Sequence, residues 1–282
     1  MAREQGSYGE AGELLDESLA LRHELGDARG IAACLQGLGD AARCQGDYDR
    51  ATALLDESLS RRRELGDRLG IAATLDSLGE LARDRGDYSR ATAMFEQSLA
   101  LWRELDNKLG IASALQGLGD VARCRGDHDQ ATAQLSASLR LLRELGSKVR
   151  TAQTLHSLGV ATRQAGDRAG AVACLAESLE MAQALGSRRG IAECLESLAA
   201  VAGADGRVEL AARWWGAAEA LRERLGAPLP ACERTAWETD VTAARAAAGV
   251  AAFRAAWAAG RAASIEQTIV DAREHSARPA PS

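Results

Sequence analysis

Apolar and polar positions along the chain follow two helical patterns that recur every 40 residues. In the repeat that begins at Gly46, apolar side chains return three or four positions apart, as on one face of an amphipathic helix. They are Leu54, Leu55, Leu59 and Leu65 in a first predicted helix, and Ile71, Leu75, Leu78 and Leu81 in a second. One helix pair cannot bury such faces alone, so successive pairs must stack. The pattern predicts an all-α protein with the architecture of an α-solenoid.

Two helix-start signals divide each repeat. The repeats begin near positions 6, 46, 86, 126 and 166, with a partial repeat from 206. Each start signal is a residue type that caps a helix N-terminus, and most of the second set follow a glycine suited to a helix C-terminus. The first set is Ser7, Asp47, Asp87, Asp127 and Asp167, and the second is Asp27, Asp67, Asn107, Ser147 and Ser187. We therefore expect five helix pairs joined by tight turns.

Small residues recur at fixed places inside the predicted helices. Glycine inside a helix costs about 1 kcal/mol relative to alanine, so its repetition indicates that neighbouring helices approach without room for a Cβ atom. The first column is Gly39, Gly79, Gly119 and Gly159, and the second is Ala11, Ala51, Ala91, Ala131, Ala171 and Ala211. Such helical glycines lack the unpaired N–H groups of a phosphate-binding loop.

The motif L-x-x-L-G followed by G-x-Y-x-x-A resembles the tetratricopeptide repeat pattern. It is carried by Leu35, Leu38, Gly39, Gly46, Tyr48 and Ala51, and it recurs in later repeats. The resemblance covers residues 1–226 and implies a right-handed superhelix of helix pairs whose second helices line a concave groove. It implies no catalytic activity, and a peptide or protein as the partner. The repeats have 40 residues instead of 34 and lack the usual helix-ending proline.

The repeat pattern decays after Gly206, and four of the five tryptophans follow that point. We interpret residues 227–272 as a helical cap, and we expect its Trp237 and Trp257, with Trp214 and Trp215 of the partial repeat, to help close the stack. An aromatic ligand site and a docking face for a partner are the alternatives. Residues 273–282 are expected to form a disordered tail.

Composition narrows the function. The net charge of −6 and the pI near 5.4 argue against direct binding of nucleic acid or an anionic membrane. The chain shows neither a secretory signal nor a long apolar run, so we expect a cytoplasmic protein. The six scattered cysteines are interpreted as small buried thiols, and the four histidines lack metal-ligand spacing. We predict no metal, no cofactor and no enzymatic activity.

Polar residues form columns on the second predicted helices. A local pairing of each Asp or Glu with the arginine three residues later would make them structural. The alternative is a groove that presents arginine forks to a partner. Arg163 lacks a nearby acid in the sequence, so we expect it to be the most available to an acidic partner group. The candidate groove residues are Gln36, Asp40, Arg43, Asp76, Glu80, Arg83, Gln116, Asp120, Arg123, His156 and Arg163.

The sequence thus favours a non-catalytic scaffold that binds a peptide or protein partner in its groove. An alternative is the sensor region of a larger ATP-dependent bacterial transcription regulator, because WWGAAEALRERLGAPLP and AAWAAGRA resemble phrases that follow the repeats in LuxR-type regulators. Residues 2–6, AREQG, align with residues 42–46, ARCQG, so the chain begins within a predicted second helix. This half-repeat would favour self-association.

Overall fold

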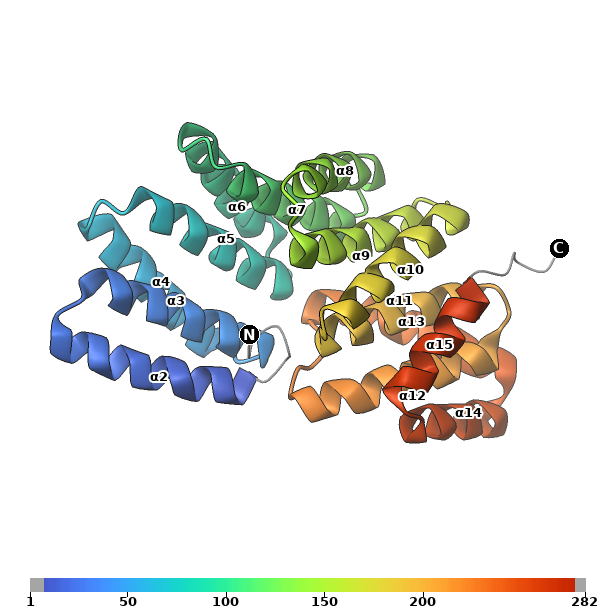
Figure 1. Cartoon of the computed structure of the whole chain (residues 1–282). Helices are drawn as coiled ribbons and strands as arrows, with labels where there is room; N and C mark the ends of the chain where they lie inside the picture. Colours follow the sequence, from blue (N-terminus) through green and yellow to red (C-terminus); the bar gives the residue numbers. More distant parts are fainter. Residues whose placement is uncertain (1–7, 277–282) are drawn as a thin grey trace. The chain divides into compact units, whose positions relative to one another are not determined.

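A computed structural model describes residues 8–276, and within them every regular element is an α-helix. The chain divides into two compact units (Figure 1). Unit 1 consists of Met1–Gly146 with Gly226–Cys232, and unit 2 consists of Ser147–Leu225 with Glu233–Ser282. The predicted all-α fold of stacked helix pairs is confirmed.

The helices follow one another at the predicted period, each with 17 or 18 residues up to α13. Unit 1 holds α2 (Tyr8–Leu25), α3 (Ala28–Cys44), α4 (Tyr48–Glu64), α5 (Arg68–Asp84), α6 (Tyr88–Glu104), α7 (Lys108–Arg125) and α8 (His128–Glu144). Unit 2 holds α9 (Lys148–Gln164), α10 (Arg168–Ala184), α11 (Arg188–Ala204) and α12 (Val208–Leu225). It also holds α14 (Val250–Ala262), α15 (Ile265–Ser276) and all but the first two residues of α13 (Ala231–Ala248).

The predicted caps lie at the helix ends. Asp27, for example, accepts a hydrogen bond from the backbone N–H of Gly30, and Asp47 does so from Arg50. Asp127 and Ser147 occupy N-cap positions without such a bond, and Ser7 lies outside the described residues. Left-handed glycines end the preceding helices in both kinds of turn. Where Asp106 replaces glycine, it adopts the same backbone form, with φ of 48°, which is strained for a residue with a side chain.

The repeated glycines lie where a second helix meets the first helix of the next repeat. A Cβ atom on Gly119 would lie 2.7 Å from Leu135 Cγ and 3.3 Å from the carbonyl oxygen of Ala131. The equivalent atom on Gly39 would lie 2.7 Å from Leu55 Cγ. Helices α3 and α4, and likewise α7 and α8, therefore pack almost backbone to backbone. The close approach predicted from the glycine column is confirmed.

A buried serine joins the same helix pairs. The Ser58 hydroxyl donates to the carbonyl oxygen of Ala32 at 2.8 Å, and Ser98 does so to Ala72 at 3.0 Å. Ser138 and Ser178 repeat the contact with Ala112 and Ala152, again across 26 positions in the sequence. The sequence analysis did not single out this column, although a serine recurs there in every repeat. Each hydroxyl fixes the sliding position of one helix on its neighbour.

In the tryptophan-rich part of unit 2, α14 packs closely against α12. Gly216 on α12 and Gly260 on α14 face the partner helix's backbone so closely that neither has room for a Cβ atom. Trp214 donates to Asp271 at 3.0 Å, and Trp257 donates to Glu219 at 2.7 Å. These tryptophans are therefore packing groups with satisfied N–H donors. Helix α15 continues to Ser276, beyond the predicted start of a tail at residue 273, and residues 277–282 lie outside the described part.

At the other end of the array, α2 exposes three leucines. Leu14, Leu21 and Leu25 are 61%, 59% and 80% exposed. Met94 and Leu101, which occupy the positions of Leu14 and Leu21 two repeats later, pack partly buried against a core cluster that includes Leu55. Self-association through α2 stays a prediction.

The tight helix contact predicts opposite effects of one substitution at two glycines. Gly119→Ala should lower the free energy of unfolding by about 1–3 kcal/mol, because the new methyl group meets Leu135 and the Ala131 carbonyl. Gly12→Ala on α2 has open space around it and should raise stability by up to about 1 kcal/mol. Urea titrations of both variants test this, and stabilisation by both would contradict the packing argument.

The buried serine hydrogen bond should contribute measurably to the free energy of unfolding. Ser138→Ala should lower the free energy of unfolding by about 1 kcal/mol. The change removes a fully buried hydroxyl and its hydrogen bond to the carbonyl oxygen of Ala112. Ser60→Ala is the matched control, since Ser60 is exposed on α4, another first helix of unit 1, and its replacement should change stability little. Equal effects of the two changes, measured by urea titration, would show that the buried hydrogen bond has no special weight.

Candidate functional site

A chain of charged side chains runs along the second helices α3, α5 and α7 of unit 1. Arg43 pairs with Glu80 at 2.5 Å and with Asp84 at 2.6 Å. Arg83 pairs with the other oxygen of Asp84 at 2.7 Å and with Asp120 at 3.3 Å. The pairs connect one repeat to the next. We call the set Arg43, Glu80, Arg83, Asp84, Asp120 and Arg123 the polar ladder.

At the end of the polar ladder, Arg123 forms the local pair considered in the sequence analysis, with the acid three residues earlier. Arg123 Nε lies 3.6 Å from Asp120 three residues earlier. For Arg43 and Arg83, the short contacts that decide the geometry instead come from the following repeat or from Asp84. Arg43 and Arg123 are less than a tenth exposed. Arg43, Arg83 and Arg123 are therefore held by the protein's own carboxylates, and they do not project as open forks.

Burial and charge strongly perturb the centre of the ladder. Burial alone would raise the pKa of Asp84, but Arg83 and Arg43 together lower this pKa to about 2. Burial would likewise lower the pKa of Arg83, yet Asp84 and Asp120 raise it well above its ordinary value. All of these groups are charged at neutral pH. Asp84 was missing from the predicted site because its column reads Glu4, Cys44, Asp84, Cys124, Gln164 and Ala204, so an acid does not recur there in successive repeats.

Two further candidates bind successive second helices together. The Gln36 amide donates to the carbonyl oxygen of Ala73 and to the Ser77 hydroxyl, at 3.2 and 3.0 Å. In unit 2, His156 Nε2 makes the equivalent contacts with Glu193 and Ser197, at 3.2 and 2.9 Å. In both cases the partners lie 37 and 41 positions later in the sequence. This column is consequently part of the stacking contact between repeats.

The remaining candidates are also enclosed. Asp76 accepts a hydrogen bond from the Trp102 indole at 2.9 Å. Asp40 is 7% exposed and lies close enough to Arg62 to influence the pKa of that guanidinium. Gln116 is half-buried on α7. None of the three projects fully into solvent.

Arg163 has a partner that the sequence did not reveal. In unit 2 its guanidinium lies 3.4 Å from Asp240 on α13, and its side chain is 22% exposed. Within its own repeat, Arg163 has no acid three residues earlier, where Val160 stands. Asp240 comes from outside the repeats, 77 positions later, so repeat periodicity gave no sign of it. With 22% of its side chain exposed, against 8%, 16% and 9% for Arg43, Arg83 and Arg123, Arg163 is still the most exposed of these four arginines, and its availability to an acidic partner group stays a prediction.

Tetratricopeptide repeat models match residues 1–64, 33–104, 70–144 and 151–187. These segments cover more than half of the chain. The chain belongs to the tetratricopeptide repeat family. No curated protein sequence matches it.

Several solved structures are also similar to this chain. The chain is similar to BtubC (BKLC) from P. vanneervenii, with a TM-score of 0.53 and 21% sequence identity over 79% of this chain and 88% of BtubC. It is also similar to a kinesin light chain candidate with nearly identical TPR-like repeats from Podospora anserina, with a TM-score of 0.44 and 20% identity. That match covers 65% of this chain and 90% of the other. At these identities the likeness concerns the fold alone.

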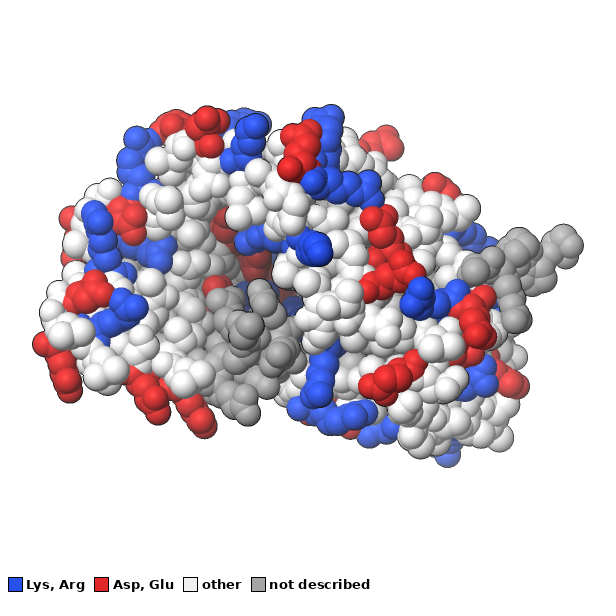
Figure 2. Space-filling model, viewed as in Figure 1, with Lys and Arg blue, Asp and Glu red and all other residues white. Residues whose placement is uncertain are grey.

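The visible surface of this tetratricopeptide repeat protein carries mixed charge. Figure 2 shows Lys and Arg interspersed with Asp and Glu, without one extended basic area on the face in view. None of the helices within residues 8–276 is long and apolar enough to cross a membrane. Within the same residues, no group of three or more His, Cys, Asp or Glu side chains is placed to hold a metal ion.

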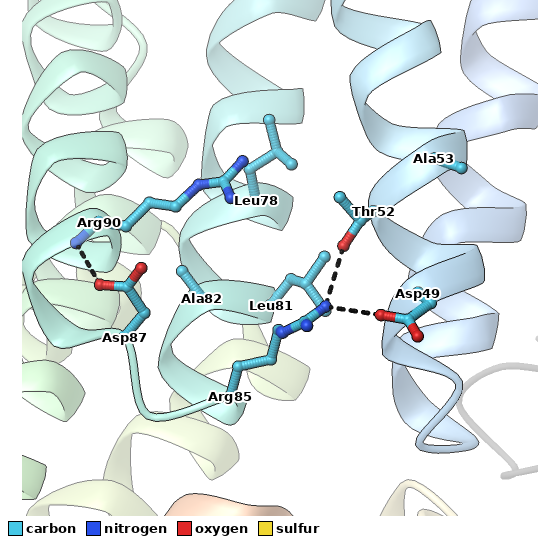
Figure 3. A pocket seen from close by; sticks show the side chains of 9 residues that line it. All are labelled: Asp49, Thr52, Ala53, Leu78, Leu81, Ala82, Arg85, Asp87 and Arg90. Atoms are coloured by element: carbon cyan, nitrogen blue, oxygen red, sulfur yellow. Dashed lines mark hydrogen bonds and ion pairs between the residues drawn. The ribbon is translucent and has the colours of Figure 1, made fainter.

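A pocket of about 550 Å³ lies between α4, α5 and the start of α6 in unit 1 (Figure 3). Leu78, Leu81 and Ala82 form part of its wall, and Arg85 reaches across to Asp49 at 3.1 Å. The Asp49 side chain is 94% exposed. Water therefore screens the ion pair, and Asp49 restrains Arg85 only weakly. The pocket is a shallow part of the repeat surface, with its charges already paired.

A second hollow, of about 710 Å³, lies between α10 and α15 in unit 2. Val172, Ala173 and Ala176 contribute an apolar wall, and Arg273 pairs with Glu180 across it at 2.5 Å. It results from the docking of α15 over α10.

The ladder predicts a specific acid sensitivity. Asp84→Asn should lower the free energy of unfolding by about 3–5 kcal/mol at pH 7, because Arg43 and Arg83 lose a buried counter-charge. The lowered pKa of Asp84 means that its contribution is present above about pH 4 and is lost as the pH falls toward about 2. Urea titrations at pH 7 and pH 3 should therefore show a smaller difference between variant and wild type at pH 3.

Asp49→Asn is the matched control, because it changes an exposed aspartate that also pairs with an arginine. It should alter stability little at either pH. An Asp84→Asn protein as stable as the wild type at pH 7 would contradict the structural role of the ladder.

Proposed function

We propose that this chain is a non-catalytic scaffold that holds an extended segment of a protein partner against the second helices of unit 1. Tetratricopeptide repeats generally mediate protein–protein interactions, and this chain belongs to that family. The observation that carries the proposal is that a short segment of the chain itself, Gly226–Cys232, already lies against unit 1. Its first five residues carry no regular secondary structure.

The contacts of this segment place it at one end of the second helices. Pro228 lies beside the turn that follows α3, since a Cβ atom on Gly46 would be 3.2 Å from its ring. Cys232 lies beside Arg83 in the last turn of α5 and beside Cys124 in the last turn of α7. Ala227 is 2% exposed. The segment Gly226–Cys232 thus supports the proposal that an extended peptide binds to this part of unit 1.

The proposed partner differs in charge from the sequence-based expectation. Among the candidate and ladder residues of α3, α5 and α7, five carboxylates outnumber three arginines: Asp40, Asp76, Glu80, Asp84 and Asp120 against Arg43, Arg83 and Arg123. The arginines are engaged with the carboxylates, so an acidic partner would have to compete for them. Glu80 is the most exposed of the ladder's three carboxylates, at 36%. We therefore propose a partner segment that brings a basic or amide group to Glu80, flanked by small apolar residues.

A peptide-display selection tests this function. Random decapeptides are selected on the full chain, and the dissociation constant of the best binder is measured by calorimetry. Glu80→Gln should weaken binding at least about tenfold, or about 1.4 kcal/mol, because it removes the charge offered to the peptide. Glu57→Gln is the matched control, because Glu57 is a similarly exposed glutamate that also pairs with an arginine, on first helix α4. Loss of binding in the control alone would place the interaction on the first helices and contradict the proposal.

A further inference from the structure

The sequence separates Cys124 and Cys232 by 108 positions, yet the fold of unit 1 brings their thiols into hydrogen-bonding contact. Cys124 lies in the last turn of α7, and Cys232 lies at the end of the segment Gly226–Cys232. Both residues are half-buried, so neither is sealed in the core as Cys34 and Cys194 are. The sequence analysis grouped all cysteines as buried thiols, which holds for Cys34 and Cys194 alone among the six.

Cationic groups surround this thiol pair. Arg83 and Arg123 both act on Cys124, and Arg83 also lies close to Cys232. The Tyr88 ring is a further neighbour of both sulfurs. Two of these groups, Arg83 and Arg123, belong to the polar ladder and are fixed there by Asp84 and Asp120. The positive charge beside the thiols is therefore built into the fold.

The surroundings make Cys124 a reactive thiol. The hydrogen bond from Cys232, with Arg123 and Arg83, lowers the pKa of Cys124 to about 7 despite the opposing effects of burial and Asp120. A sizeable fraction is thus thiolate at neutral pH, which is the form that attacks oxidants. Cys194 in unit 2 shows the opposite case, since burial raises its pKa to about 12 and it is 1% exposed.

We propose that Cys124 and Cys232 are a redox modification site, at which a hydroperoxide converts the two thiols into a disulfide that fastens the segment Gly226–Cys232 to unit 1. The Cys124 thiolate attacks one peroxide oxygen and becomes a sulfenic acid, and the leaving hydroxide takes up a proton to form water. Cys232 then loses its proton as its sulfur attacks the Cys124 sulfur, and the displaced hydroxide leaves as a second water. Two thiols and one hydrogen peroxide give one disulfide and two waters.

Mass spectrometry of the full chain tests the site. The reduced protein is treated with a few equivalents of hydrogen peroxide, alkylated, and digested without reduction. An Asp- and Glu-specific protease is needed, because Arg123 and Arg125 flank Cys124 and trypsin would leave it in a dipeptide. We expect a peptide pair that joins Cys124 to Cys232, lighter by two hydrogens and separated again by dithiothreitol. Absence of this pair, or equal formation of pairs with other cysteines, would overturn the proposal.

Single variants separate the two roles. Cys232→Ser should leave Cys124 as a sulfenic acid that dimedone labels, whereas Cys124→Ser should abolish both the label and the disulfide. Cys44→Ser and Cys174→Ser are the controls, since these cysteines are also half-buried and their removal should leave the disulfide yield unchanged. Alkylation of Cys124 by iodoacetamide should be half-maximal near pH 7. Dimedone labelling of Cys44 and Cys174 as strong as that of Cys124 would show general oxidation and contradict a dedicated site.

Discussion

The near-contact of backbones between a second helix and the first helix of the next repeat determines the other packing in each unit. At Gly39 and Gly119 the absence of a side chain lets Leu55 and Leu135 fill the space that a Cβ atom would occupy. Once the helices lie this close, a serine hydroxyl reaches a backbone carbonyl across the interface. Apolar burial supplies the attraction, while the glycine and the serine fix the distance and the sliding position. The two kinds of contact restrict each helix pair to one geometry.

The polar ladder is a consequence of this fixed geometry. With the second helices held in register, an arginine on one helix meets carboxylates on the next, as Arg43 meets Glu80 and Asp84. Burying these charges is costly, and a fully apolar interface could be as stable or more so. The ladder therefore contributes mainly to register, because any other alignment of α3 on α5 would leave buried ions without partners. It also supplies the positive charge beside Cys124, so a structural network and a reactive thiol share the same arginines.

The helix boundaries, the caps and the close glycine contacts were predictable from the sequence, because each repeats at a 40-residue period and follows from local physical rules. Contacts that break the period were not predictable. Asp84 has a cysteine, Cys44 or Cys124, at the equivalent position of each adjacent repeat, Asp240 pairs with Arg163 from outside the repeats, and Cys232 reaches Cys124 from the segment Gly226–Cys232. The repeat period groups the candidate groove residues into polar columns. It does not show that the fold pairs most of these side chains with one another. The resemblance to regulators of transcription stays a prediction.

The regular offsets of these contacts have an evolutionary consequence. Hydrogen bonds between neighbouring helices recur 26, 37 and 41 positions apart, whichever repeat they belong to. Duplication or loss of one whole repeat preserves every such offset, since each new neighbour offers the same carbonyls and hydroxyls as the old one. An insertion of any other length within a helix would turn its buried serine or glycine away from its partner. The gene can therefore lengthen or shorten in steps of 120 nucleotides, three per residue of the 40-residue repeat, and the stacking contacts remain intact.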